Sequence, residues 1–181
     1  VPQASCLMDF HSLGSRSDAL AAIYIMRYRN DDVWRRTVEL AKISGYEYIF
    51  AGLDAVRYGN LDHLNAVSPE KAIPYIGTEN PGVGTGYRDL EKNIQRAERA
   101  IKNIMKYMGI IEGKVELSRS PTFVTSPPPV TPDPSVTYKG GWMIPYVKLG
   151  QKVSKGQKLA DIVDMLGYIV ESTYAPCDGI V

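Results

Sequence analysis

The sequence has no long hydrophobic run and few cysteines. Its apolar stretches, such as residues 19–26, are far shorter than the roughly 18 to 20 residues that a membrane-spanning helix needs. The two cysteines, Cys6 and Cys177, lie far apart and outside any CxxC spacing, so neither a disulfide framework nor a cysteine zinc site is expected. No signal-like segment precedes the first pattern. We therefore expect a cytoplasmic protein with no membrane partner.

The sequence also lacks an excess of charge of either sign. It has 21 Lys and Arg residues and 20 Asp and Glu residues, for a formal net charge of +1. Proteins that bind nucleic acid usually carry a clear basic excess, so no nucleic-acid partner is expected. No serine stands in a G-x-S-x-G setting, and the glycine-rich residues 82–86 lack both the GxGxxG spacing and a GKS or GKT ending. A serine hydrolase and a nucleotide-binding loop are therefore disfavoured.

What the sequence does contain is an alternation of strand and helix patterns within 181 residues, of which 44% are hydrophobic. This pattern predicts an α/β layered sheet with helices. Strands are expected at residues 4–10, 46–51 and 73–78. Helices are expected at residues 19–28 and 33–43, in a short segment from Ser68-Pro69-Glu70, and at residues 87–108, where apolar residues recur every three or four positions.

The last third of the chain changes character. Residues 121–134 hold six of the twelve prolines, which is typical of a stiff connector. Beyond them, short β-prone segments alternate with glycines, which indicates a small all-β unit. We expect a catalytic-type α/β domain over residues 1–120, a connector over 121–135 and a β domain over 136–181. The chain begins with Val1, not Met, and stops where a closing strand is expected, so it reads as part of a longer protein.

Chemistry-bearing side chains fall at the ends of two predicted strands. Asp9 and His11 are two residues apart, so a strand places them on one side and the carboxylate can orient the imidazole. Glu79 follows the strand at residues 73–78, where a carboxylate can act as a general base. On local evidence alone, a hydrogen-bonded loop histidine is the favoured interpretation of His11, and a loop or surface glutamate is the favoured interpretation of Glu79. The second histidine, His63, lies among turn-forming residues and is expected at the surface.

Two segments carry a family resemblance. Residues 7–12, Leu-Met-Asp-Phe-His-Ser, resemble the "DLHS" or "DLHT" segment of the succinylglutamate desuccinylase/aspartoacylase family, which are zinc-dependent amidohydrolases with the zinc carboxypeptidase fold. Residues 72–80, Ala-Ile-Pro-Tyr-Ile-Gly-Thr-Glu-Asn, look like that family's "G-x-P-x-x-T-x-E-x-G" segment, and residues 96–109 look like the helix that follows it. The resemblance implies a zinc-carboxypeptidase-like mixed sheet with helices and a small C-terminal barrel-like domain.

The resemblance also implies roles for three residues. His11 corresponds to a zinc ligand, Glu79 to the general base and proton shuttle, and Asp9 to a residue that orients the site without binding the metal. Zinc polarises an amide carbonyl and acidifies water, while the glutamate carries the proton to the leaving amine. The implied substrate is a small N-acyl amino acid or a related compound.

One part of the family pattern is missing. Two zinc ligands of the family come from an H-x-x-E motif upstream of the DLH segment, and neither His11 nor His63 has Glu three residues later. One histidine does not hold catalytic zinc. We therefore expect an N-terminally truncated chain that shows little or no hydrolysis by itself.

The C-terminal segment has a resemblance of its own. Residues 147–160 and 175–181 look like the half-motifs of biotinyl and lipoyl carrier barrels. The modified lysine of those carriers has no counterpart here, because the hairpin between the two halves reads Asp164-Met165-Leu166-Gly167. An unmodified barrel-like domain is therefore expected in place of a cofactor carrier.

Two functions of different classes remain. The first is a zinc-dependent amidohydrolase. The alternative is a binding or structural protein that kept the fold without the metal, and the presence or absence of an upstream H-x-x-E distinguishes the two.

Overall fold

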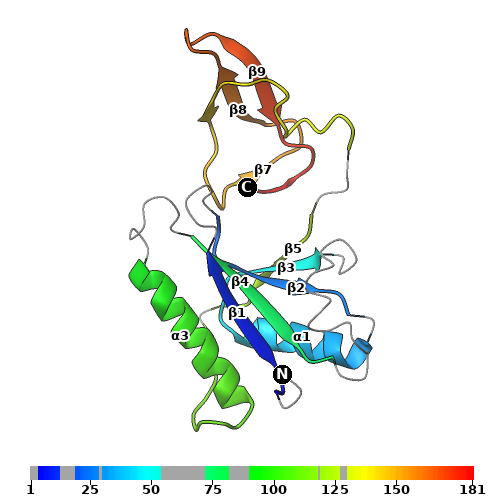
Figure 1. Ribbon diagram of the computed structural model, residues 1–181, viewed down its shortest axis with the longest axis vertical. Coiled ribbons are helices and arrows are strands. Elements are labelled where there is room, and N and C mark those ends of the chain that lie inside the picture. The colour runs from blue at the N-terminus through cyan, green and yellow to red at the C-terminus, as the bar shows by residue number, and fades with distance from the viewer. Residues whose placement is uncertain are drawn as a thin grey trace. The chain divides into compact units, whose positions relative to one another are not determined.

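A five-stranded mixed sheet forms the frame of residues 1–126 (Figure 1). The order of its strands is β1-β4-β2-β3-β5. β1 and β4 are parallel, β4 and β2 are antiparallel, and β2, β3 and β5 run parallel to one another. The strands are β1 (Leu7–Ser12), β2 (Ala22–Met26), β3 (Tyr48–Leu53), β4 (Tyr75–Asn80) and β5 (Thr122–Val124).

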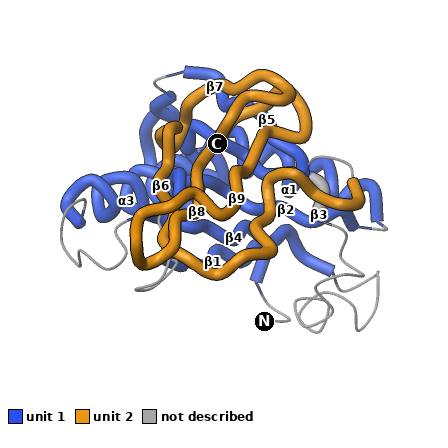
Figure 2. Tube along the Cα trace, turned by 90° about the horizontal axis from the view of Figure 1, so that it is seen from above, with its two compact units in different colours: residues 1–126 blue, residues 127–181 orange. Residues whose placement is uncertain are grey.

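This computed structural model describes residues 4–12, 19–28, 30–53, 72–81, 90–117, 119–126 and 130–181. The chain divides into two compact units, residues 1–126 and 127–181, which Figure 2 shows in different colours. The helix predicted from Ser68, the residue His63 and the glycine-rich segment 82–86 lie outside the described residues.

Local chemistry accounts for the two helices, α1 (Asp31–Ile43) and α3 (Leu90–Tyr107). Asn30 caps α1, because its side-chain oxygen accepts hydrogen bonds from the backbone N–H groups of Asp32 and Val33 at 3.0 and 3.2 Å. Gly45 follows the end of α1 with φ of 85°, and Gly109 follows α3 with φ of 71°. The helices predicted at residues 33–43 and 87–108 are thus confirmed within the described residues.

The two helices pack on one face of the sheet. Alternate residues of the strands point toward them, as in Ile23 and Ile25 of β2, which are fully buried. Cys6 packs against the same cluster, as its place in an apolar run indicates. The buried members of this core are Ile23, Ile25, Leu40, Ala41, Tyr46, Ile49, Ile76, Ala100 and Ile104.

The expectation of a helix at residues 19–28 is wrong. The segment contains β2, which pairs with β4 on one side and β3 on the other. Three alanines and the possible cap at Ser17-Asp18 favour a helix locally. Ile23 and Ile25, however, are β-branched, and only a strand turns both of them toward the core. Tyr24, between them, faces the other side, where its ring stacks on Phe50 at 5.2 Å. Pairing along both edges therefore overrides the local preference.

Residues 127–181 form a separate all-β unit. β6 (Trp142–Pro145), β8 (Lys158–Val163) and β9 (Ile169–Tyr174) make an antiparallel sheet, and β7 (Lys152–Val153) pairs with β10 (Gly179–Ile180). Asp161 is buried in β8 and accepts hydrogen bonds from Tyr146 at 2.6 Å and Ser172 at 2.5 Å, beside the Lys158 ammonium at 2.5 Å. These partners lower the pKa of Asp161 to about 2, with Lys158 the largest contributor.

Within the part of the chain that the structure describes, no helix is both long and apolar enough to cross a membrane.

Candidate active site

The register of β1 and β4 brings the predicted site residues together. His11 pairs directly with Glu79, and Asp9 pairs with Gly77. Residues that pair across neighbouring strands present their side chains on the same face. His11, Asp9 and Glu79 therefore share one face of the sheet, opposite to the face that the helices cover.

The His11 imidazole is held by Asp9. Its Nε2 atom lies 2.7 Å from Oδ2 of Asp9, and both side chains are about half exposed, at 54% and 44%. This hydrogen bond, followed by the negative charges of Asp9 and Glu79, raises the pKa of His11 above its usual value, while partial burial opposes the shift. Because Nε2 is engaged with the carboxylate, Nδ1 is the ring nitrogen that neutral His11 keeps as an acceptor or metal ligand.

Glu79 is a half-buried carboxylate with an unused oxygen. Its Oε2 atom is buried and has no hydrogen-bond partner among the described residues. Burial is the largest cause that raises the pKa of Glu79, and the charge of Asp9 adds to it while His11 opposes it. A carboxylate with a raised pKa and a buried oxygen that lacks a partner among the described residues is suited to accept a proton.

A second network holds the end of β1 from the other face of the sheet. Asn80 donates from Nδ2 to the backbone carbonyl oxygen of His11 at 3.1 Å, and it accepts a hydrogen bond from the Tyr46 hydroxyl at 3.1 Å. Tyr46 is only 1% exposed and belongs to the hydrophobic core. The position of the His11 backbone is thus tied to the core through Asn80, a residue for which sequence reasoning gives no role.

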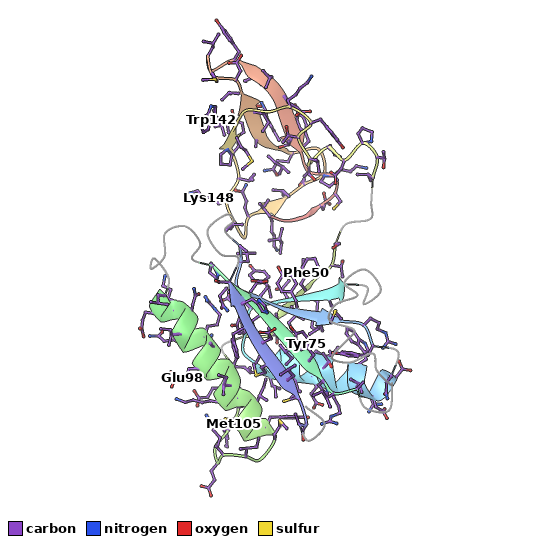
Figure 3. All side chains as sticks on the ribbon, viewed as in Figure 1. Phe50, Tyr75, Glu98, Met105, Trp142 and Lys148 are labelled. Atoms are coloured by element: carbon purple, nitrogen blue, oxygen red, sulfur yellow. The ribbon has the colours of Figure 1, made fainter. Side chains whose placement is uncertain are left out.

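Tyr75 also belongs to the site, although the sequence analysis does not predict a role for it. Its hydroxyl donates to Oδ2 of Asp9 at 3.2 Å, the same oxygen that contacts His11. The signal was present, because Tyr75, Gly77 and Glu79 alternate along one strand and must share a face. Figure 3 labels Tyr75 on the sheet of the first unit.

A cleft of about 310 Å³ opens beside His11, between the ends of β1 and β4 and the start of α3. Apolar side chains contribute most of its wall, and Ser12, Asn80 and Asn93 add polar groups. The apolar lining residues are Phe10, Pro81, Leu90, Ile94 and Ala97.

The described residues supply one histidine for a metal and no complete metal site. Within the described ranges, no group of three or more His, Cys, Asp or Glu side chains is placed to hold a metal ion. The geometry that is present fits a single ligand position, Nδ1 of His11, next to a free carboxylate oxygen of Glu79.

Comparisons with known proteins identify related folds. No protein-family profile matches the chain. The chain is 28% identical over 172 residues to the N-alpha-acetyl-L-2,4-diaminobutyric acid deacetylase of Halomonas elongata, and the match covers 91% of this chain and 46% of that protein.

Solved structures match over nearly the whole chain. The succinylglutamate desuccinylase/aspartoacylase of Rhodobacter sphaeroides has a TM-score of 0.78 at 22% identity, covering 99% of this chain and 53% of that protein. The product-bound ectoine utilization protein EutE (DoeB) of Ruegeria pomeroyi has a TM-score of 0.79 at 23% identity, covering 99% and 52%. The chain thus spans about half the length of the relatives that it matches, and these neighbours confirm the resemblance indicated by the two sequence segments.

Proposed function

We propose that this chain, which has the fold of the succinylglutamate desuccinylase/aspartoacylase family, forms the part of an amide-cleaving acyl hydrolase that carries its general base. The observation that supports this proposal most strongly is the pairing of His11 with Glu79, whose Oε2 is buried without a partner among the described residues. The deacetylase activity named for the Halomonas elongata relative agrees with it.

Glu79 is the residue to which we assign proton transfer. Its carboxylate takes a proton from the attacking water as the water oxygen bonds to the amide carbon. The same proton then goes to the nitrogen as the C–N bond breaks, so the products are a carboxylic acid, which keeps the second proton of the water until it ionises in solution, and a free amine. Burial raises the pKa of Glu79 above that of an ordinary glutamate, which favours uptake of the proton by its carboxylate.

His11 is the residue to which we assign metal binding, through Nδ1, with Asp9 fixing the ring by its bond to Nε2. Zinc at this position would supply polarisation of the carbonyl and of the attacking water. The remaining ligands come from outside the described residues, because those residues offer one histidine and no three-residue cluster.

The substrate we propose is a small N-acyl amino acid or a related compound. The name of the Halomonas elongata relative, an N-alpha-acetyl-L-2,4-diaminobutyric acid deacetylase, supports this substrate class. A zinc-carboxypeptidase-like layering of the first unit and a barrel-like second unit belong to the same proposal.

Metal removal tests this assignment. In the natural protein that carries this sequence, we expect release of free amine from Nα-acetyl-L-2,4-diaminobutyrate or another N-acyl amino acid. Activity should disappear after dialysis against a chelator and return with one equivalent of zinc, whereas magnesium should not restore it, because Mg²⁺ prefers oxygen ligands and retains its water.

Two controls accompany this assay. Replacing His63 by glutamine should leave activity intact. Residues 1–181 expressed alone should show little or no turnover, because neither histidine has a glutamate three residues later and the described residues form no three-residue ligand cluster. Full amide hydrolysis in protein that contains no zinc by elemental analysis would contradict the assignment.

A further inference from the structure

Three side chains form a hydrogen-bonded chain across β1 and β4. Oδ2 of Asp9 lies 2.7 Å from Nε2 of His11 and also accepts the hydroxyl of Tyr75 at 3.2 Å. The carboxylate thus contacts the imidazole on one side and a phenol on the other. Of the three groups, only Tyr75 is buried, at 4% exposure. Tyr75 is thus the buried end of the hydrogen-bonded chain, and Asp9 and His11 are its exposed end.

The Tyr75 ring is held in place by its surroundings. It packs in a small second cluster with Met26, Tyr28 and Val33. Toward the sheet it lies directly over Gly77, where an added Cβ atom would come within 3.1 Å of the Tyr75 hydroxyl oxygen and 3.3 Å of its Cε1 atom. Such contacts are closer than nine in ten real Cβ contacts, so a side chain at position 77 would require the ring to shift by a few tenths of an ångström. The absence of a side chain at Gly77 therefore allows the Tyr75 ring to reach Asp9, which pairs with Gly77 across β1 and β4.

We propose that Tyr75 and Gly77 are positioning residues, which fix the Asp9 carboxylate so that it keeps the His11 ring in one orientation with Nδ1 available. The effect on turnover rests on the proposed function. The effect on the His11 ring does not, because it depends only on the contacts that Asp9 makes with His11 and Tyr75.

The phenol is a dependable donor in this position. Burial, together with the nearby carboxylates of Asp9 and Glu79, raises the pKa of Tyr75 to about 12. The hydroxyl consequently keeps its proton throughout the range in which an enzyme operates, and Asp9 always finds a donor on that side.

Two matched variants disturb the hydrogen bond between the Tyr75 hydroxyl and Asp9 in different ways. Tyr75→Phe deletes the hydroxyl and keeps the ring, while Gly77→Ala keeps the hydroxyl and displaces the ring. Tyr48→Phe is the control, because it deletes a hydroxyl from the same sheet face on β3, two strands away from β4. Because both site variants break one contact, the double variant should be no worse than the single ones, which is the non-additivity expected of coupled residues.

The first readout is the tautomer of His11 in zinc-free protein, from the ¹⁵N shifts of the imidazole. The chain has two histidines, so a His63→Gln background leaves one set of signals. Above the pKa of His11, the Nε2–H form should predominate with wild-type Tyr75 and in Tyr48→Phe. Tyr75→Phe and Gly77→Ala should move the shifts toward a mixture of tautomers.

The second readout is activity of the natural protein that carries this sequence. Tyr75→Phe should lower kcat by about 10-fold with KM within about twofold, in the range found for partners that orient metal-ligating histidines. Zinc affinity should fall by a similar factor.

Unchanged His11 shifts in both site variants would overturn the proposal, as would a Tyr75→Phe phenotype equal to that of Tyr48→Phe. If the natural protein hydrolyses no amide, the proposed function fails, while the tautomer measurement still decides the role of Tyr75 and Gly77.

Discussion

Replacing Glu79 with glutamine lowers kcat by about 10²- to 10⁴-fold, the usual contribution of a positioned general acid–base group. Glutamine has nearly the same shape but cannot accept a proton from water. The Oε2 position has no partner among the described residues, so the substitution breaks no protein hydrogen bond there and the fold is expected to persist. Steady-state kinetics on the natural protein that carries this sequence measure the effect, with zinc content determined on the same samples.

The control for this substitution is Glu98→Gln. Glu98 lies on α3, pairs with Lys102 at 2.5 Å and is about half exposed, so its loss should change kcat by less than twofold, about the effect of a typical surface substitution. A Glu79→Gln enzyme with kcat close to that of Glu98→Gln would show that Glu79 does not transfer the proton.

Replacing Ile23 with alanine lowers the free energy of unfolding of the first unit by about 2 to 5 kcal/mol. Ile23 lies in β2, and its side chain is fully buried in the core that the sheet forms with the two helices. The truncation leaves a cavity and also removes a β-branched residue from a strand paired on both edges. Urea denaturation followed by fluorescence measures the change.

The two tryptophans make this measurement specific. Trp34 lies in α1 of the first unit and Trp142 in β6 of the second, so a Trp142→Phe background reports the first unit alone. Ile110→Ala is the matched control, because Ile110 is 59% exposed and its truncation should cost less than about 0.5 kcal/mol. Equal losses for the two alanine variants would contradict the placement of Ile23 in the core.

The sequence predicts that Asp9 and His11 lie at the end of one strand and that Glu79 follows another, but it does not predict that His11 and Glu79 stand opposite each other within paired strands. A period of two places Asp9 and His11 on one side of a strand, and apolar runs locate β1 and β4. That β1 pairs with β4, with His11 opposite Glu79, depends on contacts between segments 68 residues apart. The pairing is a tertiary choice that local patterns do not encode.

The wrong prediction of a helix at residues 19–28 has the same physical origin, because it also depends on pairing between distant strands. Alanine and leucine give that segment a helical preference, yet β2 is placed between β4 and β3, where pairing on two edges and the burial of Ile23 and Ile25 outweigh it. Helix α1, by contrast, was predictable because its cap, acidic first turn and terminal glycine are all local features.

His11, Asp9 and Glu79 share one site only if the charges of both carboxylates act on the His11 imidazole, and the titration of His11 tests this directly. The measurement is the pKa of the His11 imidazole by NMR in zinc-free protein with His63 replaced by glutamine. We expect a value above the ordinary histidine pKa, because the hydrogen bond to Asp9 and the charges of Asp9 and Glu79 stabilise the imidazolium. Asp9→Asn should lower that pKa most, and Glu79→Gln should lower it by a smaller amount. A His11 that titrates at the ordinary value and does not respond to Glu79→Gln would contradict the shared site.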